Sequence, residues 1–325
     1  MDSMKFRTEI DIKPWSEPID YSHNIVCLGS CFATNIAEEL SRRKFRVVAS
    51  PTGILFNPAS IAQSMRQMVA MQIPRAEELM EVEGRYVHYN FHSALGRDTR
   101  EDTITTIGTA LQRGKEALES ADMVIVTLGT AWVYRLADGG AVVANCHKQP
   151  QRLFRRELLT VEKCVAQLEE IVALAPRRVL FTVSPVRHVG EGLEDNSLSK
   201  AILRVAVDIV CRRNAVRVAY FPSYEILIDD LRDYRFYAED LAHPSRQAVE
   251  YIVEKFCDAA LSPKTKTTMA KVEGIVRAVN HRPNNPRSEA YRTFCKAQLR
   301  AIAEIECVDL SEEKRAMEQM LQINL

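Results

Sequence analysis

The feature that most constrains the fold is a series of five short apolar runs separated by longer amphipathic stretches. Each run has the length of a strand, is rich in Val and Ile, and is too continuous for a strand with one solvated face. We therefore expect buried parallel strands at Asn24–Leu28, Phe45–Ala49, Met123–Leu128, Arg178–Val183 and Arg217–Phe221. The remaining pattern predicts helices at Phe32–Arg43, Pro58–Met71, Asp102–Ser120, Thr160–Ala175, Asn196–Arg213 and Ser245–Ala260. This alternation predicts right-handed βαβ crossovers and an α/β fold, with a parallel sheet of about five strands covered by helices on both faces.

Two regions interrupt the alternation of strands and helices. Residues 71–100 are irregular and predict an insertion. Tyr134–Leu153 contains Asp138-Gly139-Gly140 between two short extended runs, which is typical of a turn in a hairpin.

The composition changes after Leu261, where a polar break precedes a predicted helix at Met269–Val279 and a long helical pattern from Ser288 to about Leu321. We therefore predict a main domain over residues 1–260 and a helical C-terminal extension over residues 261–325. An amphipathic helix buries its apolar face against something. The extension could accordingly pack on the core or form a homo-oligomer with a second copy of the chain.

Composition excludes several classes of partner. Lys and Arg total 43 and Asp and Glu total 43, so no basic field favours nucleic acid or an anionic membrane. Met1–Pro14 lacks the apolar core of a secretory signal, and no apolar run approaches the roughly 20 residues of a membrane span. We therefore expect a cytoplasmic protein that binds neither nucleic acid nor membrane. The eight cysteines include no CxxC pair, which argues against a zinc site or a disulfide framework.

The first predicted strand runs directly into a helix through Gly29-Ser30-Cys31. A strand, a tight glycine turn and a helix start place the next side chains at the carboxyl edge of the sheet, where helix N–H groups favour negative charge. This position suits a nucleophile, for which Ser30 and Cys31 are the candidates. The alternative is that Ser30 caps the helix and Cys31 is packed.

A second candidate motif is Asp240-Leu241-Ala242-His243, which precedes the last helix of the main domain. An Asp three residues before a His can accept a hydrogen bond from one ring nitrogen while the other faces a nucleophile. The motif is weak alone, because a solvated loop Asp beside a capping His would look the same. Paired with the turn at Gly29, it predicts a general base.

These motifs, in this order, resemble the GSCFA family, a group placed among the SGNH (GDSL-like) hydrolases. The resemblance covers about residues 5–260. The similar blocks are Gly29-Ser30-Cys31-Phe32-Ala33, Gly53 to Pro58, His92-Ser93, Thr127 to Trp132, Cys146-His147-Lys148, Ser184 to His188, Ser199-Lys200, Tyr220 to Glu225 and Asp240 to Pro244. The resemblance implies an SGNH-hydrolase-like (flavodoxin-like) three-layer α/β/α sandwich and ester-hydrolase chemistry.

The SGNH pattern begins with Gly-Asp-Ser, whose third residue is the nucleophile. Aligned without gaps, Cys31 takes the nucleophile position and Ser30 the Asp position; a shift by one residue would make Ser30 the nucleophile. The two are nearly equal candidates, and we favour Cys31 because it needs no shift of the register. A cysteine beside a His and a helix start can already be a thiolate before attack, whereas a serine would need His243 to remove its proton. The other catalytic candidates are His243 and Asp240.

Oxyanion-hole candidates follow from the same alignment. Gly53 and Gly129 match the glycines of the second and third SGNH blocks, with Asn57 and Thr130 nearby. Ala131 stands where the family pattern has an asparagine donor. Losing one such donor typically costs about 10²-fold or more in rate, so this departure bears on catalytic efficiency.

Further polar residues follow the predicted strands or lie in the insertions, and they predict a polar pocket wall. An Arg-His-Lys cluster there could hold a carboxylate, a sulfate or sugar hydroxyls, and the alternative is a hydrogen-bonded loop network. The substrate-binding candidates are His92, Trp132, His147, Lys148, Ser184, Arg187 and His188. None of His147, His188 and His243 has a second histidine four residues away, so we expect neither a metal nor another cofactor.

The leading hypothesis is a metal-independent hydrolase or acyltransferase that acts on an ester, such as an O-acyl group on a carbohydrate. The carbohydrate comes from the SGNH resemblance alone. The main alternative is a catalytically degenerate protein that kept the fold as a binding or interaction module. A nucleotide-binding protein is a third reading, and it fails because neither GxGxxG nor GxxxxGK is present.

Overall fold

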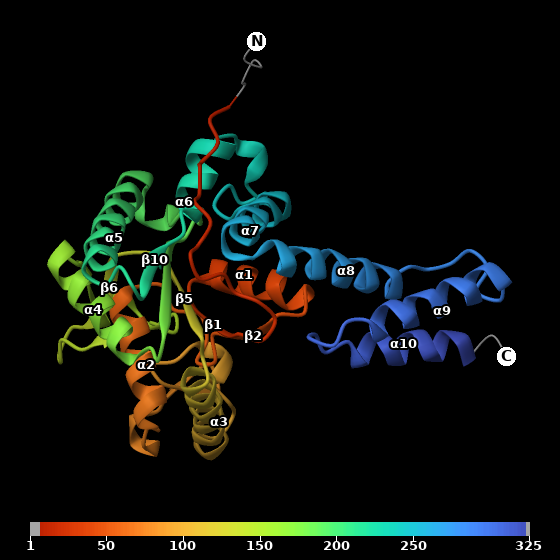
Figure 1. Cartoon of the computed structure of the whole chain (residues 1–325). Helices are drawn as coiled ribbons and strands as arrows, with labels where there is room; N and C mark the ends of the chain where they lie inside the picture. Colours follow the sequence, from red (N-terminus) through yellow and green to blue (C-terminus); the bar gives the residue numbers. More distant parts are fainter. Residues whose placement is uncertain (1–6, 323–325) are drawn as a thin grey trace, which may run out of the picture. The chain divides into compact units, whose positions relative to one another are not determined.

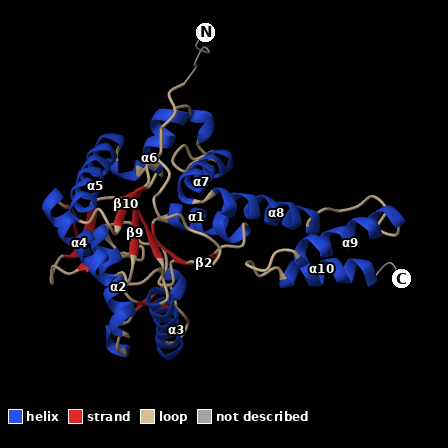
Figure 2. Cartoon of the chain, viewed as in Figure 1, coloured by secondary structure: helices blue, strands red, loops and turns tan. Residues whose placement is uncertain are grey.

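The computed structural model describes residues 7–322 and contains a central sheet of five strands (Figures 1 and 2). The strands lie in the order β10 (Val218–Tyr220), β9 (Arg178–Val183), β5 (Met123–Leu128), β1 (Asn24–Gly29) and β2 (Arg46–Ala49). The pairs β1–β5, β5–β9 and β9–β10 are parallel. Counted along the chain, the order is 2-1-3-4-5, which places a topological switch point between β1 and β5. The expected parallel sheet is confirmed, with strand bounds within one residue of those predicted.

The sheet is buried on both faces. Helices α2 (Pro58–Ala70), α3 (Arg100–Glu119), α4 (Val161–Leu174) and α5 (Leu193–Arg213) contribute to one apolar core with side chains of β1, β5 and β9. Residues that alternate with these along the strands, such as Ile25, Cys27 and Ile125, are equally buried. Burial on both faces explains the continuous apolar runs and fits a three-layer α/β fold.

The remaining helices of this part also lie near their expected positions. Helix α1 (Cys31–Arg42) follows β1, and α7 (Arg246–Ala260) is the last predicted helix before Leu261. Between β10 and α7, the short α6 (Ser223–Glu225) continues into a π-helical turn at Ile226–Leu231. The sequence pattern did not predict this π-helical turn.

The interrupting regions form two small antiparallel sheets. Strands β3 (Met80–Val82) and β4 (Arg85–Val87) pair within the predicted insertion. The expected hairpin is instead a three-stranded sheet, in which β6 (Trp132–Leu136) lies between β7 (Val142–Val143) and β8 (Phe154–Leu158). Strand β8 was missed because its centre, Arg155-Arg156-Glu157, is charged and solvated, as an edge strand tolerates.

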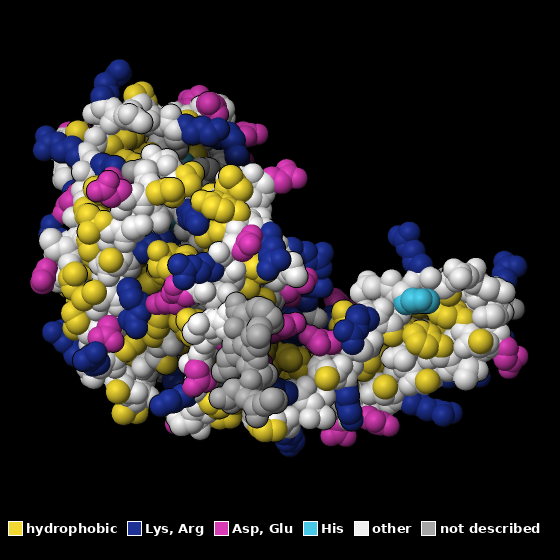
Figure 3. Space-filling view, turned by 90° about the horizontal axis from the view of Figure 1, so that it is seen from above, with side chains coloured by type: hydrophobic (Ala, Val, Ile, Leu, Met, Phe, Trp, Pro, Cys, Tyr) yellow, Lys and Arg dark blue, Asp and Glu magenta, His cyan; other side chains and the backbone are white. Residues whose placement is uncertain are grey.

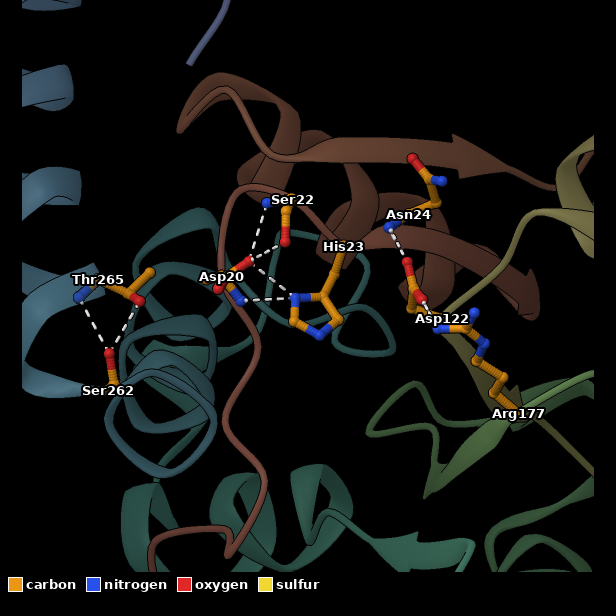
Figure 4. Close-up of polar contacts among 8 residues, drawn as sticks. All are labelled: Asp20, Ser22, His23, Asn24, Asp122, Arg177, Ser262 and Thr265. Carbon is orange, nitrogen blue, oxygen red and sulfur yellow. Dashed lines mark hydrogen bonds and ion pairs between the residues drawn. The ribbon is translucent and has the colours of Figure 1, made fainter. Parts of the chain in front are cut away.

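The amino ends of the central strands are tied together by one carboxylate (Figure 4). Asp122 accepts a hydrogen bond from the backbone N–H of Asn24 at 2.9 Å and pairs with Arg177. Because these three residues precede or begin β5, β1 and β9, they fix the end of the sheet away from the Gly29 turn.

The chain divides into two compact units. The first contains residues 7–12, 24–37 and 47–253, and the second contains residues 13–23, 38–46 and 254–322. Helices α8 (Pro263–Val279), α9 (Glu289–Ala303) and α10 (Ser311–Gln322) belong to the second unit. Helix α8 begins earlier than predicted, because Ser262 caps it by accepting from the backbone N–H of Thr265 at 3.1 Å (Figure 4).

The long helical pattern from Ser288 to about Leu321 forms two helices, α9 and α10. Residues 304–310 separate α9 from α10, and Asp309 accepts a hydrogen bond from the backbone N–H of Ser311 at 3.0 Å where α10 begins. The break lets the two helices pack on each other, with the hydroxyl of Tyr291 3.1 Å from the sulfur of Met320. Two short helices bury apolar side chains that one extended helix would expose.

Charge is not segregated on the face drawn in Figure 3, where basic and acidic side chains are interspersed. Within residues 7–322, no helix is both long and apolar enough to cross a membrane.

Candidate active site

The turn after β1 can be built only with glycine. Gly29 has a φ of 119°, and a Cβ atom there would lie 2.1 Å from the carbonyl oxygen of Thr127 on β5. The next residue, Ser30, donates its backbone N–H to the same oxygen at 2.9 Å. The turn is thus fixed to the neighbouring strand, and Cys31 begins α1 at the carboxyl end of the sheet.

The two nucleophile candidates differ in accessibility. Ser30 is buried, and within the described residues its hydroxyl has no hydrogen-bond partner. Cys31 is only partly buried. Burial raises the pKa of the Cys31 thiol, and it is opposed by the N–H groups of Phe32 and Cys31 at the helix start and by the charge of Lys200. Asp240 also raises this pKa, so its carboxylate acts on the thiol.

Asp240 and His243 form the expected pair. One carboxylate oxygen of Asp240 accepts from the backbone N–H groups of Ala242 at 3.0 Å and His243 at 2.9 Å. The other lies 2.6 Å from Nδ1 of His243. These contacts, led by the His243 N–H, lower the pKa of Asp240 to about 2. The carboxylate therefore stays ionised, holds the proton on Nδ1, and leaves Nε2 to act as a base.

Lys200 on α5 belongs to one of the blocks that resemble the family, but the sequence did not predict a role for it at the site. The residue is 1% exposed, and its ammonium donates to the carbonyl oxygens of Gly129 and Ser184, each at 2.7 Å. Gly129 and Ser184 follow β5 and β9, so Lys200 ties two neighbouring strand ends together at the edge that carries Cys31. A signal was available, because Lys200 shares a helix face with the apolar Leu203 and Val207.

His188 is kept neutral beside these charges. Burial lowers its pKa to about 4, with further lowering from Lys200 and His243. The imidazole of His188 lies edge-on to the ring of Phe56, with 5.7 Å between the ring centres, and its Nε2 lies close to Gly129. The charges of Lys200 and Asp240 act on Cys31, and those of Lys200 and His243 act on His188, which links these five residues into one neighbourhood.

The oxyanion-hole candidates lie close to the turn, but most of their backbone donors are used. The segment at residues 55–57 crosses the ends of β1 and β5: Leu55 donates to the carbonyl of Gly29 at 2.9 Å, and the Phe56 carbonyl accepts from Gly129 at 2.7 Å and Thr130 at 3.0 Å.

The other two candidates are Gly53 and Asn57. The Gly53 N–H donates to Ser50 at 2.8 Å. Asn57 uses its side-chain oxygen to cap α2, and no hydrogen bond within the described residues uses its amide donors. Asn57 is therefore the candidate with donors to offer.

Two of the loop candidates, His147 and His92, belong to one group of contacts. His147 lies 3.1 Å from the hydroxyl of Ser93 and 2.9 Å from the carbonyl of His88, and His92 adjoins Gly53. Burial lowers the pKa of His88, His92 and His147. This group is a hydrogen-bonded loop network, which was the alternative considered for these residues. Of the expected Arg-His-Lys cluster, His147 belongs to this network, and Lys148, beside it, is exposed.

Three other candidates make defined contacts. The ring of Trp132 supports the Arg156 guanidinium at 3.6 Å. Ser184 is buried, with its hydroxyl accepting from the N–H of Val186 at 3.3 Å. Arg187 lies in the loop after β9, and its backbone N–H donates to Ala242 at 3.0 Å. Within the described part of the chain, no three His, Cys, Asp or Glu residues group as metal ligands.

The fold and the site define an α/β protein with a candidate nucleophile at the switch point of a parallel sheet. Comparison with known proteins identifies the family to which the chain belongs. Residues 24–256 match the GSCFA family, and residues 272–323 match the GSCFA domain protein, C-terminal domain. The chain therefore belongs to the GSCFA family.

No curated protein matches the chain. It is similar to a solved structure provisionally described as a platelet activating factor from Streptococcus pneumonia, with 12% identity and a TM-score of 0.35, over 74% of this chain and 84% of that one.

Proposed function

We propose that this protein is an SGNH-like ester hydrolase or acyltransferase with Cys31 as nucleophile and His243, oriented by Asp240, as general base and acid. The observation that carries the proposal is the Asp240–His243 pair, whose carboxylate oxygens are divided between two backbone N–H groups and Nδ1. That division fixes the tautomer a catalytic base needs. The influence of Asp240 on the Cys31 thiol supports their working together.

The reaction proceeds in two steps. Nε2 of His243 takes the thiol proton as the sulfur attacks the ester carbonyl, and then gives this proton to the departing alkoxide, so that an alcohol leaves and a thioester remains on Cys31. In the second step His243 takes a proton from water or from an acceptor alcohol. The thioester is cleaved to an acid or a new ester, and the proton returns to the sulfur. We assign the oxyanion donor to Asn57, because its side-chain amide donors are unused within the described residues.

A second candidate function is a binding module that has lost catalysis. It is favoured by three observations: the raised pKa of the Cys31 thiol, the alanine at position 131, and the backbone donors of Gly53, Gly129 and Thr130 that are already used. A thiol that stays protonated in an incomplete oxyanion hole would bind an ester without cleaving it.

The test is turnover of 4-nitrophenyl acetate, with the acyl adduct located by mass spectrometry. We expect the acetyl group on Cys31, an inactive Cys31→Ala variant, and an active Ser30→Ala variant in which Cys31 still reacts with iodoacetamide. An active Cys31→Ala with an inactive Ser30→Ala would transfer the role of nucleophile to Ser30. Absence of both turnover and adduct in the wild type would favour the binding module.

A further inference from the structure

Arg187 is held near the candidate base by aromatic rings. Its guanidinium lies 4.0 Å from the ring centre of Tyr237 and 5.2 Å from that of Tyr234. Its backbone N–H donates to the carbonyl of Ala242, the residue before His243. Tyr234 is 61% exposed and Arg187 is partly exposed, so solvent reaches this stacked arrangement.

Several of the other stacked arginines have a carboxylate partner, whereas Arg100 over Tyr86 and Arg235 over Phe236 have none among residues 7–322. Arg204 lies over Tyr220 and pairs with Glu225 at 3.2 Å, and Arg156 lies over Trp132 and pairs with Asp195 at 3.3 Å. Arg187 has no Asp or Glu within ion-pair distance among residues 7–322. A guanidinium offers planar donors that match a carboxylate, and the rings of Tyr234 and Tyr237 already fix the position of Arg187. A ligand could therefore supply the carboxylate that Arg187 lacks among the described residues.

The position also indicates which part of an ester this ligand group belongs to. In the proposed reaction His243 gives its proton to the departing alkoxide, so groups beside His243 face the alcohol part of the ester. We propose that Arg187, held by Tyr234 and Tyr237, binds a carboxylate on the alcohol part of the substrate. This inference rests on the proposed function and narrows its substrate class to esters of acidic alcohols, such as acylated acidic sugars.

The test compares two esters that differ only in charge, 4-acetoxybenzoate and 4-acetoxybenzamide, by acetate release. We expect the wild type to favour the benzoate by about tenfold or more in kcat/KM, as a charge-assisted bidentate contact allows. Arg187→Gln should remove this preference by lowering kcat/KM for the benzoate to the level of the benzamide. Arg235→Gln is the matched control, because it removes an equal charge from the segment that carries Tyr234 and Tyr237 and should keep the preference.

An unchanged preference in Arg187→Gln would overturn the inference and leave the proposed function standing. A third ester, 4-acetoxyphenyl sulfate, checks the kind of anion: hydrolysis of the sulfate as efficiently as the benzoate would overturn the assignment to carboxylates.

Failure of the proposed function has a different signature, in which none of the esters is hydrolysed. Calorimetric binding of 4-hydroxybenzoate and 4-hydroxybenzamide then tests Arg187 directly. Selective binding of the benzoate by the wild type, lost in Arg187→Gln, would support the anion site. Equal binding by both proteins, or no binding, would overturn it.

Discussion

The chain contains the same four-residue spacing twice, as Asp20-Tyr21-Ser22-His23 in the second unit and Asp240-Leu241-Ala242-His243 in the first. Both place a carboxylate oxygen against Nδ1 of the histidine, at 2.9 Å in the first motif and 2.6 Å in the other. Figure 4 shows the Asp20 motif. The spacing alone thus produces the contact and says nothing about function.

The surroundings of the two carboxylates differ. A single oxygen of Asp20 accepts from the backbone N–H and the hydroxyl of Ser22 and also meets His23. Nδ1 of His23 additionally lies 3.1 Å from the backbone N–H of Asp20, which needs an acceptor there. Nδ1 of His23 therefore faces one group that needs a donor and another that needs an acceptor, so its protonation is not fixed. Asp240, by contrast, keeps one oxygen for Nδ1 of His243 alone. The comparison teaches that the division of the carboxylate oxygens, rather than the spacing, fixes which ring nitrogen carries the proton.

The largest expected effect would break the comparison directly. Asp240→Asn should lower ester turnover by about 10³- to 10⁴-fold, because the tautomer and the charge that stabilises the imidazolium are both lost. Asp20→Asn is the matched control and should leave turnover unchanged. Equal effects of the two substitutions, measured as kcat/KM with folding checked by circular dichroism, would remove any special role for Asp240.

A second prediction concerns the stability of the first unit against acid. The pKa of folded His188 is about 4, below its usual value near 6.5, so the unfolded chain takes up a proton first as the pH falls. The contribution of His188 is present above pH 6.5 and is lost toward pH 4, amounting to about 2 kcal/mol between pH 7 and 5. Urea unfolding should show this loss, reduced in His188→Gln. An equal loss in the variant would show that other groups cause it.

A smaller effect is expected from the buried ammonium at the site. Lys200→Met should raise the pKa of the Cys31 thiol further and slow its alkylation at pH 8 by about tenfold, because a nearby positive charge favours the thiolate. The pH profile of iodoacetamide labelling at Cys31 measures this shift. Lys163→Met removes an exposed ammonium paired with Glu157 and should leave the profile unchanged. A profile that does not move in Lys200→Met would reduce Lys200 to a structural tie.

The sequence carried enough information for the central sheet and for the acid–histidine pair. Continuous apolar runs follow directly from burial on both faces, and the Asp240 contact is local, spanning three residues. The features that were missed depend on distant contacts. Lys200 is defined by carbonyls 71 and 16 residues away, and the charged strand β8 is defined only by its partner β6. Single-sequence patterns record periodicity and local spacing, so such long-range pairings leave little trace in them.

The smallest expected effect concerns the hydroxyl of Ser22, which binds Asp20 and has no counterpart in the Asp240 motif. Ser22 occupies the position that Ala242 holds in the other motif, and its hydroxyl lies 2.6 Å from Asp20. This hydroxyl is the main cause of the lowered pKa of Asp20, so Ser22→Ala should raise that pKa toward its usual value. Because the contact is exposed, the loss of stability should stay below about 1 kcal/mol, and turnover should not change. Carboxylate titration by NMR measures the pKa, and an unshifted Asp20 would mean that the backbone N–H of Ser22, which both proteins keep, sets its acidity instead.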